Sequence, residues 1–264
     1  MHKIAKHLQL QPNFKYLTRG LQYGIYEDGS AESVYDDLYS VKAGAYIEFD
    51  LANNCQPKYH DFYNLSENVA KQQAEINNFN YRELESTVIE TFQNACIDRL
   101  HADVPISIAL SGGLDSSSVA AIIKNESPKI RAFCFGSSSD KKSEGPLVQL
   151  FAQEQNISAK FVDPTIEDWG EGFWQTLDQQ DSPFAGLSVV AQNLLYKYIR
   201  QNGYKVVLGG QGGDEAFLGY RKFQLFFLKE LLAKRQWLNL TIFASYFMQM
   251  LWAERRRLST FWQI

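Results

Sequence analysis

The sequence predicts an α/β fold, in which a mostly parallel sheet carries helices on both faces and follows a short β-rich segment. From residue 104 onward, short apolar runs typical of strands alternate with stretches of helical periodicity, and this alternation favours a parallel sheet. Two of the apolar runs end abruptly in glycine-rich turns, at 111–113 and 209–213. With 264 residues, 45% of them hydrophobic and 21% charged, the chain has the composition of a globular protein with a large core.

The part of the chain before residue 104 carries weaker signals. Residues 20–26 and 44–50 combine alternating apolar positions with turn residues, which predicts short strands. Residues 68–80 are polar, and we expect them to form a linker that runs into a helix. Residues 81–100 have the pattern of an amphipathic helix. Its apolar positions recur every four residues, at Leu84, Val88, Phe92 and Cys96.

The alternating part of the chain predicts a series of strands and helices. We expect strands at 106–110, 130–135, 158–162 and 205–208, and helices at 117–124, 144–155 and 189–202. Ligands of such sheets bind beyond the carboxyl ends of the strands, where both glycine-rich turns are expected. Apolar helices at 223–232 and 238–258 follow. The segment 241–252 is too short and too interrupted to span a bilayer, so we expect it to be a buried helix.

The turn after the strand at 106–110 has the composition of a phosphate-binding loop. It consists of Ser111, Gly112, Gly113, Leu114, Asp115, Ser116 and Ser117. Glycines let the backbone approach an anion, and the following helix start adds unpaired amides and a positive dipole end. A carboxylate beside a phosphate, here Asp115, implies a bridging cation such as Mg²⁺. The alternative is an ordinary strand–turn–helix corner with capping serines. Neither G-x-x-x-x-G-K-[ST] nor G-x-G-x-x-G occurs in the sequence.

The second glycine-rich turn follows the strand at 205–208. Four glycines occupy five positions from Gly209 to Gly213, which again permits close approach of backbone to a ligand. Asp214 and Glu215 then stand at a helix start, where carboxylates are favoured. Taken alone, these two acids are equally well explained as residues that complement the helix dipole.

Composition excludes several classes of function. A net charge of −4 argues against nonspecific binding of nucleic acid. The 3 cysteines are far apart and form no C-x-x-C pair, so the sequence suggests neither a zinc site nor a disulfide framework. The apolar run at the N-terminus is too short for a signal peptide. We therefore expect a cytoplasmic protein that binds no nucleic acid and no membrane.

Together the two turns resemble a known pair of motifs. The first is similar to the pyrophosphate-binding loop of ATP pyrophosphatases. Followed by the second, it resembles the synthetase domain of glutamine-dependent asparagine synthetases, whose family includes β-lactam synthetases and lasso-peptide cyclases. Further matches lie at 133–136, 143–144, 181–183 and 219–221. The resemblance implies a fold of the adenine nucleotide alpha hydrolase type. It also implies two parts: a remnant of the glutaminase domain and linker at 1–66, and a C-terminally incomplete synthetase domain at 67–264.

The resemblance implies roles for individual residues. Asp115 and Asp214 would hold Mg²⁺, and Glu215 would join them among the catalytic residues. Leu110, Phe135 and Gly210 would line the adenine and ribose pocket. The ATP phosphates would be bound by Ser111, Gly112, Gly113, Asp115, Ser116 and Ser117. The implied reaction joins a small-molecule or peptide carboxylate to ATP as an acyl-adenylate, after which an amine displaces AMP to leave an amide.

Three departures from the family pattern limit what the resemblance implies about the reaction. Residue 2 is His2, where complete members carry the glutaminase cysteine, so we expect that activity to be missing and a separate glutaminase or other chain portions to act as partners. Gln211 stands where asparagine synthetases have a glutamate, and an amide cannot act as a general base. The chain stops at Ile264, where members continue with a helical region. The basic run at 254–257 is expected to be a solvated helix end.

Three functions stay open on the sequence. The first is an asparagine synthetase-like ligase that joins aspartate and ammonia. The second is a peptide-forming or β-lactam-forming cyclase, which Gln211 favours. The third is a noncatalytic ATP-binding remnant, which the missing ends favour. More distant ATP pyrophosphatases, such as NAD or GMP synthetases, share only the first loop.

Overall fold

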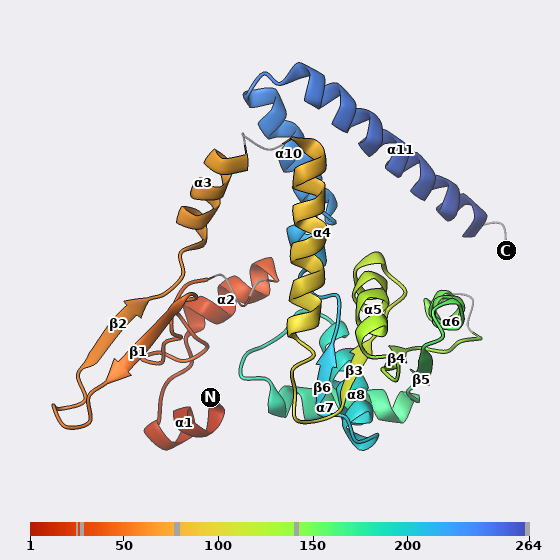
Figure 1. Ribbon diagram of the computed structural model, residues 1–264. Coiled ribbons are helices and arrows are strands. Elements are labelled where there is room, and N and C mark those ends of the chain that lie inside the picture. Colours follow the sequence, from red (N-terminus) through yellow and green to blue (C-terminus); the bar gives the residue numbers. More distant parts are fainter. Residues whose placement is uncertain (25, 27–28, 77–79, 140–142, 262–264) are drawn as a thin grey trace.

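A computed structural model of the chain describes residues 1–24, 26, 29–76, 80–139 and 143–261, without the side chains of 76, 251 and 253–261 (Figure 1). Its helices and strands follow in the order α1 (His2–Leu8), α2 (Phe14–Tyr23), β1 (Ala45–Phe49), β2 (Pro57–Asp61), α3 (Leu65–Ile76), α4 (Tyr81–Asp98), β3 (Ile106–Ala109), α5 (Leu114–Glu126), β4 (Arg131–Phe135), α6 (Gly145–Glu154), β5 (Ser158–Val162), α7 (Ile166–Gln179), α8 (Ser188–Gln201), β6 (Val206–Leu208), α9 (Gly213–Ala216), α10 (Arg221–Ala233) and α11 (Trp237–Phe261).

Four parallel strands form the central sheet, in the order β5-β4-β3-β6. Ile108 of β3 pairs with Ala132 of β4 on one side and with Leu208 of β6 on the other. The chain adds β4 and β5 on one side of β3 and then returns to add β6 on the opposite side. The direction of winding therefore reverses between β3 and β6. This sheet confirms the four predicted strands to within one residue at each end.

Helices cover both faces of the sheet, as predicted. On one face, Ile108 and Ala132 are fully buried and belong to a core cluster that also receives side chains from three helices. Those helices are α4, α5 and α6, which contribute Cys96, Val119, Ala120, Ile123, Val148 and Ala152. On the other face, Phe133 packs with Leu195 and Ile199 of α8. Neighbouring residues of β4 alternate between the two clusters because successive strand side chains point to opposite faces.

Capping residues mark the starts of two helices in the sheet region. Asn80 and Glu83 form a reciprocal capping box at the start of α4, which confirms the helix predicted at 81–100. Thr165 and Asp168 form a second box at the start of α7. The sequence analysis did not predict α7, although this pair of residues is the signature of a helix start.

Two expectations for the N-terminal part are wrong. Residues 20–23 lie in the last turns of α2 instead of a strand, and Gly20 is buried against the ring of Tyr26. Residues 68–76 belong to α3 instead of a linker; residues 77–79 lie outside the described part. The strand expected at 44–50 is confirmed as β1, which pairs antiparallel with β2. Since α1 and α2 precede this hairpin, residues 1–66 are mixed in structure, not mainly β.

The apolar segment at 241–252 is helical, as predicted, but it is not buried. Within α11, Ile242 is 48% exposed, Tyr246 65% and Trp252 58%. The helix packs on α10 through an edge-to-face contact of Phe243 with Phe227, whose ring centroids lie 4.9 Å apart. Figure 1 shows α11 standing apart from the sheet, with its start beside α10. The expectation failed because an apolar helix is buried only where enough elements surround it, and α10 covers one side of α11. The side chains of 254–257 lie outside the described part.

None of the helices among the described residues has the length and apolar character needed to cross a membrane.

Candidate functional site

The first glycine-rich turn connects β3 to α5 at the carboxyl end of the sheet. The backbone N–H of Leu110 donates to the carbonyl of Phe133 over 2.8 Å, which extends the ladder to the edge of the turn. Gly112 then adopts a φ of +76°, a conformation that side chains other than glycine rarely take. Gly113 is the N-cap of α5 and makes no side-chain capping bond. The first turn of α5 thus presents backbone amides without a capping side chain over them, a geometry suited to an anion.

Hydroxyl groups fix the shape of this turn from within. The Ser116 side chain is buried, and its Oγ accepts from the Ser111 backbone N–H at 3.2 Å and donates to the Gly113 carbonyl at 3.3 Å. The same Oγ lies 3.0 Å from the Oγ of Ser111. Ser116 was predicted to bind phosphate, and in this structure its hydroxyl braces the loop. Ser111 is exposed and Ser117 is half-buried, so their hydroxyl groups are more accessible to a ligand.

The second glycine-rich turn meets the first at Asp115. A Cβ added to Gly210 would lie 2.5 Å from the backbone nitrogen of Ser116, and one added to Gly213 would overlap the carboxyl group of Asp115. At Gly210 the obstacle is backbone, and at Gly213 it is the Asp115 side chain, so the backbone of the second turn rests directly on the start of α5. The prediction that the two turns converge is therefore confirmed. They flank the point between β3 and β6 where the winding reverses, which is where open α/β sheets bind ligands.

Three carboxylates and one tyrosine lie where the two turns meet. Asp214 and Glu215 lie in the single turn of α9, and the Tyr220 hydroxyl donates to Oε1 of Glu215 over 3.2 Å. This hydrogen bond and the charge of Glu215 raise the pKa of Tyr220, with smaller contributions from the charges of Asp214 and Asp115. Since Gly213 packs against Asp115 and directly precedes Asp214 and Glu215, the three acids lie near one another. Among the described residues, no ion pair involves Asp115, Asp214 or Glu215.

The chemistry of this crevice fits a magnesium-bound phosphate chain. Mg²⁺ in phosphate-binding sites keeps few protein ligands, commonly one or two carboxylates, and completes its shell with phosphate oxygens and water. Asp115 and Asp214 can supply that number. Within the described ranges no group of three or more His, Cys, Asp or Glu side chains is arranged to hold a metal ion by itself. The glycine backbone opposite Asp115 carries no side chain that could cover its carboxylate.

The residues predicted for the nucleotide pocket differ in their surroundings. Leu110 is 1% exposed and its side chain packs in the core, so only its backbone could face a nucleotide. Phe135, at the carboxyl end of β4, is half-buried and packs edge-to-face against Trp169 of α7, with ring centroids 5.6 Å apart. Sequence reasoning missed Trp169 because it missed α7. The sequence also gives no signal for the role of Tyr220, which lies in the family match at 219–221.

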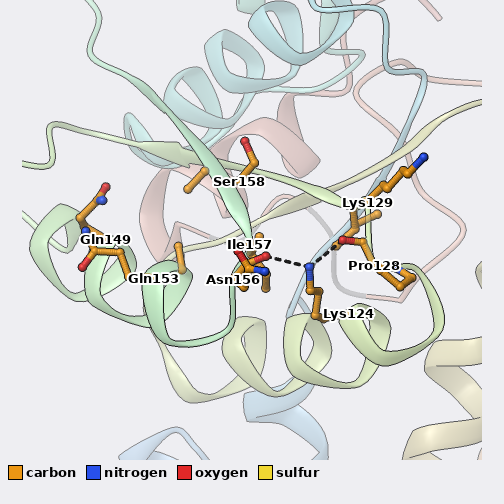
Figure 2. Close-up of a pocket in the computed structure, with 11 residues that line it drawn as sticks. Lys124, Pro128, Lys129, Gln149, Gln153, Asn156, Ile157 and Ser158 are labelled. Carbon is orange, nitrogen blue, oxygen red and sulfur yellow. Dashed lines mark hydrogen bonds between the residues drawn. The ribbon is translucent and has the colours of Figure 1, made fainter.

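Two cavities in the described part of the chain lie away from this crevice. The first, of about 570 Å³, opens near the amino ends of β4 and β5 and is lined by Lys124, Lys129, Gln149, Gln153, Asn156 and Ser158, among others. Figure 2 shows the Lys124 ammonium donating to the carbonyls of Pro128 and Asn156, over 2.6 and 2.7 Å. The second, of about 440 Å³, lies along α8 near Tyr196 and Tyr204. Neither contains a residue of the two turns. We place the candidate site at the turns because carboxyl ends of parallel strands, not their amino ends, bind ligands.

Comparison with known proteins identifies the family of this chain. Residues 87–263 match the asparagine synthase family model. The chain is 33% identical over 150 residues to asparagine synthetase [glutamine-hydrolyzing] 1 of Arabidopsis thaliana, covering 50% of this chain and 24% of that protein. It is 31% identical over 147 residues to amidase chyE of Penicillium rubens, covering 50% and 22%.

One solved structure gives a more distant likeness. The NH3-dependent NAD synthetase of Campylobacter jejuni has a TM-score of 0.35 and 19% identity, covering 54% of this chain and 61% of that chain. The chain spans about a quarter of the length of the two curated relatives above. The family match extends over more than half of the chain and includes both glycine-rich turns. The chain therefore belongs to the asparagine synthase family.

Proposed function

We propose that this chain forms an amide bond at the expense of ATP, through an acyl-adenylate. The observation that supports this most directly is the contact between the two turns, which places Asp115 between a helix start and a bare glycine backbone. That arrangement offers amides for phosphate oxygens and carboxylates for a cation in one crevice. Membership of the asparagine synthase family supports the same type of reaction.

The residues of the chain would act as follows. The amides of Gly112, Gly113 and the first turn of α5, with the hydroxyls of Ser111 and Ser117, would bind the phosphates of ATP. A carboxylate oxygen of the acid substrate would attack the α-phosphorus, and the bond to the bridging oxygen would break to release pyrophosphate. The amine would then attack the acyl carbon and displace AMP, losing a proton. Asp115 and Asp214 would hold Mg²⁺, which supplies charge neutralisation at the phosphates.

The acid and the amine are the open parts of the proposal. Aspartate with ammonia is the first candidate, because asparagine synthetases are among the relatives. An exposed glutamine at position 211 favours a different acceptor, since an amide cannot take a proton from the incoming amine. The second candidate is therefore a ligase or cyclase of the same family that uses another carboxylate and amine. We propose a small-molecule or peptide carboxylate as substrate, a cytoplasmic location, and a separate protein as the source of the amine.

The test is exchange of radioactive pyrophosphate into ATP, measured with the full chain, Mg²⁺ and candidate carboxylates. Wild-type protein should catalyse exchange, and Asp115→Asn and Asp214→Asn should each reduce the rate by about 100-fold or more, since each removes one charge at the reacting phosphates. Circular dichroism should show an unchanged fold for both variants. Binding of ATP without exchange under every acid tested would indicate the third alternative, a noncatalytic nucleotide-binding chain. Full exchange by either variant would refute its assignment.

Product analysis separates the two catalytic candidates. Asparagine should appear when aspartate and ammonium are supplied together with ATP. Exchange without asparagine, dependent on some other carboxylate, would favour the second candidate.

A further inference from the structure

Tyr220 occupies a turn that brings it back over α9. Leu218 adopts a φ of 59°, and the backbone N–H of Gly219 donates to the carbonyl of Asp214 over 2.9 Å. A Cβ at Gly219 would overlap Oδ1 of Asp214, so the chain reverses directly against that carboxylate. The reversal carries Tyr220, the N-cap of α10, to the side of Glu215.

Two sets of contacts hold the Tyr220 side chain. Its ring packs edge-to-face on Phe223, with centroids 5.6 Å apart, and the Lys222 ammonium lies 5.6 Å from the ring centroid of Tyr220. At the other end, its hydroxyl donates to Oε1 of Glu215 over 3.2 Å. A phenol hydroxyl donates a hydrogen bond without bringing a positive charge. It can therefore orient a carboxylate while leaving the negative charge of the crevice available to a cation.

Glu215 is the third acid of the crevice, and its position matters for the cation. It follows Asp214 in the same turn, yet among the described residues no three acids are arranged around a common metal position. A cation that binds phosphate must keep coordination sites open for phosphate oxygens and water. A third protein carboxylate on the ion would occupy one of those sites.

We propose that Tyr220 is a positioning residue that holds Glu215 out of the cation's ligand set, so that Asp115 and Asp214 alone offer carboxylates to the ion. The inference rests on the proposed function, because it takes these two aspartates as the cation ligands. To bind the ion through Oε1, Glu215 must break its hydrogen bond to Tyr220. Removing the hydroxyl removes that cost, and the expected result is tighter binding of the bare cation.

The experiment measures binding of Mn²⁺ to the full chain without ATP, by electron paramagnetic resonance. Tyr220→Phe should tighten Mn²⁺ binding by about 3- to 10-fold, the factor that one ordinary hydrogen bond represents. The double variant Tyr220→Phe/Glu215→Gln should return to the wild-type affinity, because the released side chain is then uncharged. Tyr196→Phe is the matched control: Tyr196 accepts a hydrogen bond from Gln192 on α8, and its loss should leave Mn²⁺ affinity unchanged.

Three results would overturn the inference. These are unchanged or weaker Mn²⁺ binding by Tyr220→Phe, tightening that persists in the double variant, and no Mn²⁺ binding by any variant. Failure of the proposed function has a separate signature, namely absence of pyrophosphate exchange by the wild-type chain. If wild-type protein exchanges pyrophosphate and Tyr220→Phe binds Mn²⁺ like wild type, only the inference about Tyr220 fails.

Discussion

Replacing Gly213 by alanine tests whether the contact between the two turns serves the reaction. Gly213 is not one of the glycines with a positive φ, so its backbone accepts alanine without strain. The new methyl group would instead overlap the carboxyl group of Asp115. That carboxyl group sits at the end of a rotatable side chain and can turn away, at a cost of about 0.5–1.5 kcal/mol for an unfavourable rotamer, while the Cβ of Asp115, 2.9 Å from the new methyl group, must shift slightly.

The structure therefore predicts a small loss of stability and a large loss of activity. Displacing a reacting or metal-binding group by about 1 Å can lower a rate by roughly 100-fold. We expect Gly213→Ala to lower pyrophosphate exchange by a factor of that order, while urea denaturation shows a loss of about 1 kcal/mol. In contrast, a Cβ at Gly170 in α7 meets no atom within 4 Å, so Gly170→Ala is the matched control. This control should keep full exchange and gain about 0.5–1 kcal/mol. Wild-type exchange by Gly213→Ala would show that the position of the Asp115 carboxyl does not matter, and the reasoning would be refuted.

Three further predictions concern side chains that the structure buries. Ser116→Ala removes a hydroxyl that bonds within the first turn, so we expect a loss of about 1–3 kcal/mol in the free energy of unfolding and weaker ATP binding, with Ser118→Ala as the control. Retained ATP affinity would show that the turn keeps its shape without that hydroxyl. A thiol reagent at pH 8 should label exposed Cys55 in the native protein and leave Cys96 and Cys134 unlabelled until urea is added, as mass spectrometry can show. Burial, with the charge of Glu144, raises the pKa of Cys134 from 9.0 to about 11, so the folded state retains that proton where the unfolded state has lost it. The free energy of unfolding should therefore fall between pH 9 and 11, by about 2–3 kcal/mol from this thiol. Rapid native labelling of Cys134 would contradict its burial.

The sheet could be predicted because its signals are local. The strands at 106–110 and 158–162 are short apolar runs bounded by turn residues, and the residues of each run alternate between two buried faces. The two glycine-rich turns could also be assigned to one edge, because each follows a strand of a parallel sheet. Adjacency of β3 and β6 is a property of the strand order, and only the structure establishes it.

The failures have physical causes that the sequence does not display. The apolar segment of α11 was expected to be buried, but hydrophobic character does not determine how many neighbours surround a helix. Residues 20–23 alternate like a strand, yet they complete the turns of α2, where Gly20 packs against the ring of Tyr26. The position of Tyr220 depends on a chain reversal at Leu218 and Gly219. The positive φ of Leu218 has no signature in the sequence. The hydrogen bond between Tyr220 and Glu215 could therefore not be inferred.

The strand order has a consequence for how this protein folds. The turn after β3 and the turn after β6 are separated by about a hundred positions of chain, since Ser107 pairs with Val207. A growing polypeptide can form β3, β4 and β5 with their helices long before β6 has been synthesised. Until β6 docks, Asp115 has no glycine backbone against it. Under the proposed function, affinity for ATP should emerge only when the sheet is complete, and bound ATP would in turn stabilise the docked last strand.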